Sequence, residues 1–188
     1  SYGHDLHAMR AAVTERTRLV FIANPNNPTG TWVGSDALAG FLTSLPKHVL
    51  VLIDEAYYEY VDESGYPNGV AWVQRFPNLI VTRTFSKVYS LAGLRVGYAV
   101  TAPETINELR RIQLPFTVNT LAEVAAVEAL KYQDRVRERV ARNAAAVAFL
   151  TDALRSRGIP VADSQTNFVY TNFGARSGTI TEGLLKAG

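Results

Sequence analysis

Residues 81–98, with the sequence VTRTFSKVYSLAGLRVGY, hold a lysine, two hydroxyl side chains and an arginine at short spacing. Lys87 follows Thr84 and Ser86, and Arg95 stands eight residues after the lysine. Only four of the 19 lysine and arginine residues are lysines, so a lysine here needs an explanation. A lysine amine can act as a nucleophile or carry a proton, and the planar fork of an arginine suits a phosphate. Taken singly, Lys87 is most simply a solvated loop lysine.

Two further polar stretches follow apolar runs in the same way. NPNNPTG (24–30) comes directly after RLVFIA, and DEAYYEY (54–60) comes directly after VLVLI. Each has a simpler interpretation, since Asn, Pro and Gly are turn residues, Asp54 could cap a helix and Tyr57 could be a core aromatic. In open α/β sheets, however, ligands bind beyond the carboxyl ends of the strands. Three such stretches after three strand-like runs therefore predict one shared site.

The elements that would position these residues follow from hydrophobic patterning. Short apolar runs bounded by turn residues predict buried strands at 18–23, 49–53, 78–84 and 95–100. Helical patterns lie at 5–16, with Asp5 as a cap, and from Ser35 to about Ser44. Strands separated by helix-length segments indicate crossover connections and a mostly parallel sheet.

The pattern changes after Pro103. A helix is predicted near 103–113, followed by a break at LPF and about forty residues of helical periodicity that end near 156–158. TNFVYTN (166–172) then predicts a strand, and 179–188 predicts a further helix.

Composition excludes several classes of function. The chain of 188 residues has 47% hydrophobic residues and a net charge of +2, without the dense basic block of a nucleic-acid groove. It has no cysteine, and three scattered histidines (His4, His7 and His48) make a weak case for a metal. No apolar stretch approaches the roughly 20 residues of a membrane span, and no signal-peptide core precedes residue 12. We expect a cytoplasmic protein that binds neither nucleic acid nor membrane.

Together the motifs resemble those of the fold-type-I aminotransferases that depend on pyridoxal 5′-phosphate (PLP), most closely the histidinol-phosphate aminotransferase group and its aromatic-aminotransferase relatives. The resemblance runs through RLVFIANPNNPTG, IDEAYYEY, RTFSKVYSLAGLRVGY, LPFTVN and SQTNFV, and so covers nearly the whole chain. It implies an α/β fold like that of aspartate aminotransferase: a large domain whose mostly parallel sheet has helices on both faces, and a smaller α+β domain. We expect residues 1–118 in the large domain, 119–158 as a linking helical segment and 159–188 as the start of the small domain.

The resemblance also assigns roles to individual residues. Lys87 would form a Schiff base with PLP and then act as the catalytic proton carrier. Asp54 would keep the pyridine nitrogen of PLP protonated, which the cofactor needs in order to accept electrons. The remaining cofactor contacts would be Asn27 and Tyr57 at the phenolic oxygen, and Thr84, Ser86 and Arg95 at the phosphate. Asn167 would contact the substrate carboxylate, and a role as a strand-end turn residue stays open for it.

The implied reaction transfers an amino group from L-histidinol phosphate to 2-oxoglutarate, giving imidazole acetol phosphate and L-glutamate in histidine biosynthesis. The partners would be a small-molecule amino donor, a 2-oxo acid acceptor and a second copy of the protein. An aromatic amino acid aminotransferase is the alternative, since PFTVN stands where PFNVN is expected in many histidinol-phosphate enzymes. A PLP-sensing regulator domain and an inactive remnant are alternatives of other classes. Family members are much longer, so we expect a fragment with little activity alone.

Overall fold

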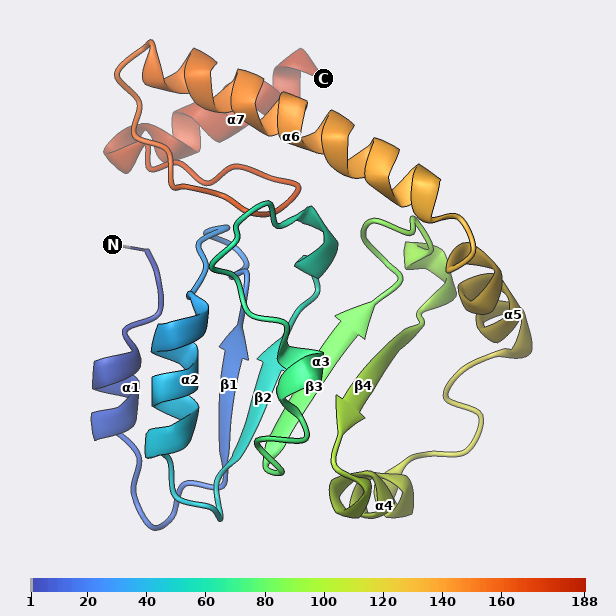
Figure 1. The fold of residues 1–188 in the computed structure, drawn as a ribbon. Helices are drawn as coiled ribbons and strands as arrows, with labels where there is room; N and C mark the ends of the chain where they lie inside the picture. The colour runs from blue at the N-terminus through green and yellow to red at the C-terminus, as the bar shows by residue number, and fades with distance from the viewer. Residues whose placement is uncertain (1) are drawn as a thin grey trace.

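A four-stranded sheet forms the centre of the computed structural model, which describes residues 2–188 (Figure 1). The strands lie in the order β1 (Leu19–Ala23), β2 (Leu50–Asp54), β3 (Leu79–Thr84) and β4 (Gly97–Thr101). β1, β2 and β3 are parallel, as predicted, whereas β4 runs antiparallel to β3. Ala23 pairs with Asp54 and Asp54 pairs with Thr82, so the three parallel strands end at one edge of the sheet.

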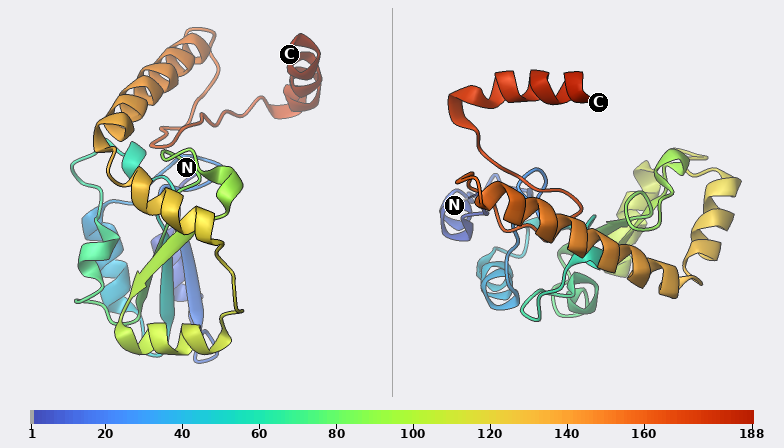
Figure 2. Two further views of the ribbon diagram at one scale, coloured as in Figure 1. Left: turned by 90° about the vertical axis from the view of Figure 1, so that its right-hand side faces the viewer. Right: turned by 90° about the horizontal axis from the view of Figure 1, so that it is seen from above.

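One face of the sheet carries the main core. It is covered by α1 (Leu6–Ala11), α2 (Ser35–Ser44) and α3 (Gly69–Trp72), which lie together on one side of the strands in Figure 2. Ile22, Val51 and Val81, from successive strands, are fully buried beneath these helices. The opposite face keeps apolar side chains at the surface, since Leu19 is 53% exposed and Phe21 is 54% exposed.

The second half of the chain is mostly helical. Its helices are α4 (Pro103–Ile112), α5 (Thr120–Ala129), α6 (Gln133–Arg155) and α7 (Ser177–Ala187), and the 3₁₀ helices of the chain are η1 (Tyr58–Tyr60), η2 (Ala92–Leu94) and η3 (Gly174–Arg176). Asn119 caps α5 by accepting a hydrogen bond from the Ala122 amide. In Figure 1, α6 crosses above the edge at which β1, β2 and β3 end. No helix within residues 2–188 combines the length and apolarity needed to cross a bilayer.

Two helix predictions needed correction. The helix predicted over 5–16 ends at Ala11, because Thr17 Oγ1 accepts the Thr14 amide and closes a turn instead. The Asp5 cap is confirmed, since its carboxylate accepts the Ala8 amide at 2.9 Å. The forty-residue helical stretch is two helices, broken at 130–132.

The strand predicted at 166–172 is wrong. Over that range, which the structure describes in full, only an isolated bridge between Thr171 and Val161 forms. The hydroxyl groups of Ser164 and Thr166 both donate to the carbonyl of Phe168, at 2.7 and 3.2 Å. These local hydrogen bonds compete with strand pairing, so the segment is a turn-rich loop.

Candidate active site

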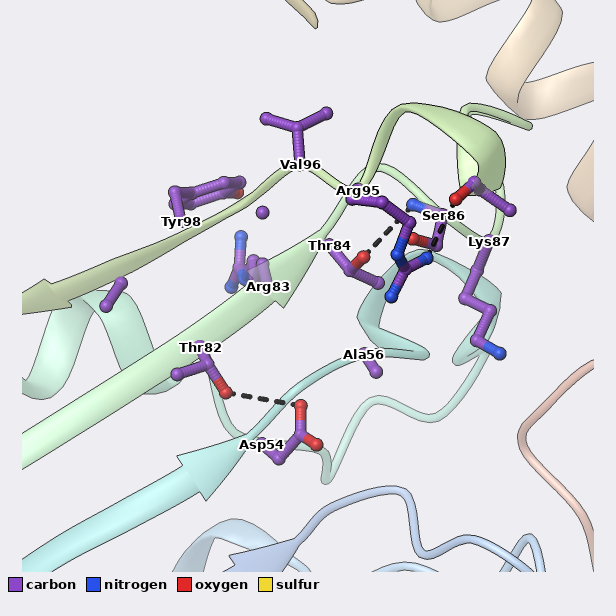
Figure 3. A pocket seen from close by; sticks show the side chains of 13 residues that line it. Asp54, Ala56, Thr82, Arg83, Thr84, Ser86, Lys87, Arg95, Val96 and Tyr98 are labelled. Carbon is purple, nitrogen blue, oxygen red and sulfur yellow. Dashed lines mark hydrogen bonds between the residues drawn. The ribbon is translucent and has the colours of Figure 1, made fainter. Parts of the chain in front are cut away.

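A cavity of about 660 Å³ lies at the sheet edge where β2 and β3 end (Figure 3). Five of the predicted site residues line it: Asp54, Thr84, Ser86, Lys87 and Arg95. Figure 3 shows Asp54 and Thr82 on one side of Ala56, and Ser86, Lys87 and Arg95 on the other. The volume lies within the range of about 300–1,000 Å³ that is typical of small-molecule sites.

Asp54 is the last residue of β2 and is half-buried. The Thr82 hydroxyl on the neighbouring strand donates to its Oδ1 atom at 3.2 Å. Asp54 therefore offers an oriented carboxylate on the cavity wall.

Lys87 lies in the turn that follows β3. Thr84 Oγ1 accepts the Ser86 amide at 3.0 Å, which makes the chain turn just before the lysine. Phe85 anchors this turn in a second buried cluster with Ala122 and Ala126 of α5. As a result, the lysine side chain is carried by a loop that α5 holds from behind.

Arg95 reaches the cavity from a strained backbone position. Its φ and ψ angles are 54° and 47°, in the left-handed region that costs a residue with a side chain about 1–2 kcal/mol. Arg95 Nη1 donates to the Ala92 carbonyl at 2.7 Å, which fixes the direction of the side chain. Strain of this kind is tolerated where the surroundings determine the conformation, and it clusters at functional sites.

Tyr57 and Asn27, thirty residues apart, meet beside Lys87. Asn27 Nδ2 donates to Tyr57 Oη at 2.9 Å, and the Lys87 amine lies 5.2 Å from the centroid of the Tyr57 ring. Tyr57 is 4% exposed and meets Phe168 edge to face, with 5.3 Å between ring centroids. Tyr57 thus connects the 24–30 loop, the lysine and the C-terminal segment.

The loop that carries Asn27 is fixed by a buried asparagine. Asn24 Nδ2 donates to the Val33 carbonyl at 3.0 Å, and the Val33 amide donates to Asn24 Oδ1 at 2.8 Å. The Tyr66 hydroxyl donates to the Asn24 carbonyl, and burial raises the pKa of Tyr66 well above its ordinary value. This anchoring leaves Asn27 itself exposed at the loop tip.

Asn167 lies apart from the other predicted residues. It is exposed and is not among the residues that line the cavity, although its neighbour Phe168 contacts Tyr57.

Sequence reasoning missed an ion pair at the cavity wall, between Arg83, which lines the cavity, and the buried Glu55. Glu55, which is 1% exposed, accepts hydrogen bonds from Arg83 Nε at 2.8 Å and from the Gly69 amide at 2.9 Å. Burial raises the pKa of Glu55, and the guanidinium of Arg83 opposes that rise. A charged residue inside the apolar run NLIVTRT was the signal that could have pointed to it.

The five predicted residues bring an amine, a carboxylate, two hydroxyls and a guanidinium to one cavity. Such a set could hold a cofactor that has a carbonyl group, a basic ring nitrogen and a phosphate. Within the described part of the chain, no three histidine, aspartate or glutamate side chains gather as a metal site.

Comparison with known proteins points the same way. The family model "Aminotransferase class I and II" matches residues 1–186. The histidinol-phosphate aminotransferase 1 of Nitrosococcus oceani is 50% identical over 187 residues, which are 100% of this chain and 50% of that protein. An aromatic amino acid aminotransferase of Nocardia farcinica is 48% identical over 189 residues, 100% of this chain and 53% of that protein. The chain spans about half the length of these curated relatives.

A solved structure extends the likeness to the fold. The crystal structure of histidinol-phosphate aminotransferase from Sinorhizobium meliloti in complex with pyridoxal-5′-phosphate has a TM-score of 0.86 and 33% identity. The match covers 94% of this chain and 48% of that one. The predicted α/β fold of the type I enzymes is thereby confirmed, and the chain belongs to the class I and II aminotransferase family.

Proposed function

We propose that this protein is a PLP-dependent aminotransferase that moves the amino group of L-histidinol phosphate to 2-oxoglutarate. The observation that carries the proposal is that Asp54, Lys87 and Arg95 line one cavity at the carboxyl edge of the sheet. The names and 45–52% identities of the relatives called histidinol-phosphate aminotransferase support the choice of substrate.

The residues present fit PLP group by group. The aldehyde requires an amine, which Lys87 offers, and the ring nitrogen requires a carboxylate, which Asp54 offers from the end of β2. The phosphate requires several donors and a positive charge, and Thr84, Ser86 and Arg95 supply them at the same cavity. When bound, PLP supplies a carbonyl that condenses with amines and a conjugated ring that accepts electrons.

The protein's own groups would then control the proton and the orientation of the substrate. Lys87 Nζ would accept the proton from the substrate Cα atom and return it, as a general acid and base. The Tyr57 ring lies beside this amine, and the hydrogen bond from Asn27 fixes the phenol. Asn167 is proposed as a contact of the substrate carboxylate.

The proposal is tested by locating the cofactor. The protein is incubated with PLP, reduced with borohydride to make the link to an amine permanent, digested, and analysed by mass spectrometry. We expect the pyridoxyl group on Lys87 and its loss in Asp54→Ala. Labelling spread over the other three lysines, Lys47, Lys131 and Lys186, would contradict a specific site.

An aromatic amino acid aminotransferase is the second candidate, because the Nocardia farcinica relative is 48% identical. The two reactions differ in their amino donor, so turnover of histidinol phosphate and of phenylalanine is compared in the intact protein. Faster turnover of phenylalanine would favour the second candidate.

The proposal extends to the organisation of the protein. We propose a cytoplasmic homodimer, with residues 1–118 in a large PLP-binding domain, 119–158 as a linking segment and 159–188 in a small domain. Remote substrate contacts supply the binding energy that positions the reacting atoms, so we expect little turnover from these 188 residues alone. Turnover equal to that of a full-length relative would refute that expectation.

A further inference from the structure

Glu55 and Arg83 form a buried pair that none of the proposed catalytic steps uses. The Glu55 carboxylate is fully enclosed, and 13% of the Arg83 side chain is exposed. Arg83 Nη2 lies 2.7 Å from Glu55 Oε2, and the guanidinium lies 3.5 Å above the centre of the Tyr58 ring. Arg83 Nη2 also donates to Asn68 Oδ1 at 3.2 Å. The guanidinium is therefore fixed by a carboxylate, a ring and an amide at once.

The Glu55 carboxylate is closely surrounded by the backbone of Gly69 and the side chain of Val81. Its Oε1 atom accepts the Gly69 amide, and a Cβ atom on Gly69 would lie 2.5 Å from that oxygen. The same Cβ atom would lie 3.1 Å from Val81 in the main core. The fit of Gly69 against the carboxylate restricts Glu55 to one placement.

Each residue of the pair is adjacent in the chain to residues that line the cavity. Glu55 follows Asp54 directly, and Arg83 stands between Thr82 and Thr84. Successive side chains of a strand point to opposite faces, so Glu55 is buried beside Gly69 and Val81 while Asp54 lines the cavity. Arg83 also lines the cavity, and its guanidinium reaches from there to the buried carboxylate. The Glu55 amide donates to the Thr82 carbonyl at 2.9 Å, which extends the pairing of the two strands up to the pair.

A buried ion pair is a poor source of stability, because the cost of removing two charges from water offsets their attraction. In some proteins such a pair instead specifies one arrangement, since any other register leaves both charges buried without a partner. The ends of β2 and β3 must keep one register relative to each other, because the two strands carry different parts of the same site.

We propose that Glu55 and Arg83 are positioning residues that fix the ends of β2 and β3, and with them the separation between Asp54 and the turn at Thr84–Lys87. The proposed function assigns neither residue a contact with a reacting atom. The effect of the pair on cofactor binding rests on the proposed function, whereas its effect on the strand ends does not.

The first test is amide hydrogen exchange of the protein without cofactor. Glu55→Gln keeps the shape and the acceptor for Gly69 but removes the charge, and we expect exchange over residues 82–87 to become about tenfold faster while β1 is unchanged. Glu59→Gln is the matched control, because it removes a neighbouring half-buried carboxylate, and it should leave residues 82–87 unchanged.

The result has two readings. Faster exchange in Glu55→Gln that is confined to residues 82–87 supports the proposal. Unchanged exchange overturns it. An equal effect of Glu59→Gln, or faster exchange that also includes β1, overturns it as well. If Glu55→Gln does not fold, Arg83→Lys serves in its place, since it keeps the charge but loses the fork, and the same criteria apply.

The second test measures PLP binding by absorbance in the same variants. We expect about tenfold weaker binding in Glu55→Gln and none of this loss in Glu59→Gln. Unchanged PLP binding in Glu55→Gln would show that the Glu55–Arg83 pair does not affect the cofactor site. Failure of the unsubstituted protein to bind PLP would refute the proposed function, while the exchange result would still decide the role of the pair.

Discussion

At the scale of single residues, Tyr57 joins parts of the site that come from distant segments. Its hydroxyl accepts a hydrogen bond from Asn27, its ring faces the Lys87 amine, and its ring meets that of Phe168 at nearly a right angle. Because Tyr57 is 4% exposed, its ring cannot turn away without disturbing these contacts. The position of Lys87 therefore depends on a residue that is itself held by the C-terminal segment.

Replacing Tyr57 with Phe removes only the hydroxyl and keeps the ring. We expect the free energy of unfolding to fall by about 0.5–1.5 kcal/mol, since Asn27 is exposed and its amide regains water. Urea denaturation measures the loss. In an Asn27→Ala background the same substitution should cost almost nothing more, and an undiminished cost there would show that the hydrogen bond is not the cause.

Removing Arg83 should make stability depend on pH through Glu55. Burial raises the pKa of Glu55 and Arg83 opposes the rise, so Arg83→Met raises the pKa further. A carboxyl whose pKa is higher in the folded than in the unfolded state stabilises the fold below the unfolded pKa of about 4.3, and this contribution disappears as pH rises through the folded pKa. The destabilisation by Arg83→Met should therefore grow with pH, to about 3–5 kcal/mol.

Urea denaturation of Arg83→Met at a series of pH values from about 4 to 8 tests this sign. The double variant Glu55→Gln, Arg83→Met should show no such growth, because the titrating group is gone. A destabilisation that shrinks as pH rises would contradict the assignment to Glu55.

At the scale of elements, β4 lies against the backbone of β3 at Gly97, one of the residues that line the cavity. A Cβ atom on Gly97 would lie 2.8 Å from the Arg83 carbonyl, closer than side chains normally approach backbone. Gly97 follows Arg95 and Val96 in the chain, so the close pairing of β4 also sets where the arginine emerges.

Gly97→Ala should push β4 away from β3 and cost about 1–3 kcal/mol of stability. It should also weaken the binding of phosphate-bearing ligands, because Arg95 moves with the strand. Gly93→Ala is the control, since nothing lies within 4 Å of the added atom. Urea denaturation and PLP titration of both variants provide the comparison, and equal behaviour would rule out the steric explanation.

The elements also show what the sequence could and could not predict. Strand runs were found within about two residues, because a continuous apolar run bounded by turn residues has few alternatives. The strand predicted at TNFVYTN failed, since the hydroxyls of Ser164 and Thr166 bind locally to Phe168. Contacts such as Asn27 with Tyr57 or Glu55 with Arg83 join residues about thirty positions apart, and no local pattern records them.

At the scale of the whole molecule, the sheet has two unequal faces. The helices α1, α2 and α3 cover one of them, whereas Leu19, Phe21 and Leu50 of the other are 53%, 54% and 36% exposed. Exposed apolar surface on a sheet is a site of association. The 188-residue chain in isolation should therefore attract apolar probes and other copies of itself.

Phe21→Lys should reduce that association without loss of fold, because the side chain is already half in solvent. Sedimentation velocity over a range of concentrations would show less oligomer in the variant, and circular dichroism would show an unchanged fold. Arg16→Lys, a neutral change at an exposed position, is the control. A chain that is monomeric at every concentration would contradict the prediction.

The adjacency of Asp54 and Glu55 limits how the length of this protein can vary. One carboxylate lines the cavity and the next pairs with Arg83, and their roles are separated only by the alternation of the strand. A single codon gained or lost within β2 would turn each carboxylate to the opposite face of the sheet, so that the cavity and Arg83 could not both keep their carboxylates. The same change in the exposed Lys47–His48 connection ahead of β2 would leave every side chain of the strand on its present face. Insertions and deletions should therefore be tolerated in this connection, whereas selection should remove them from β2.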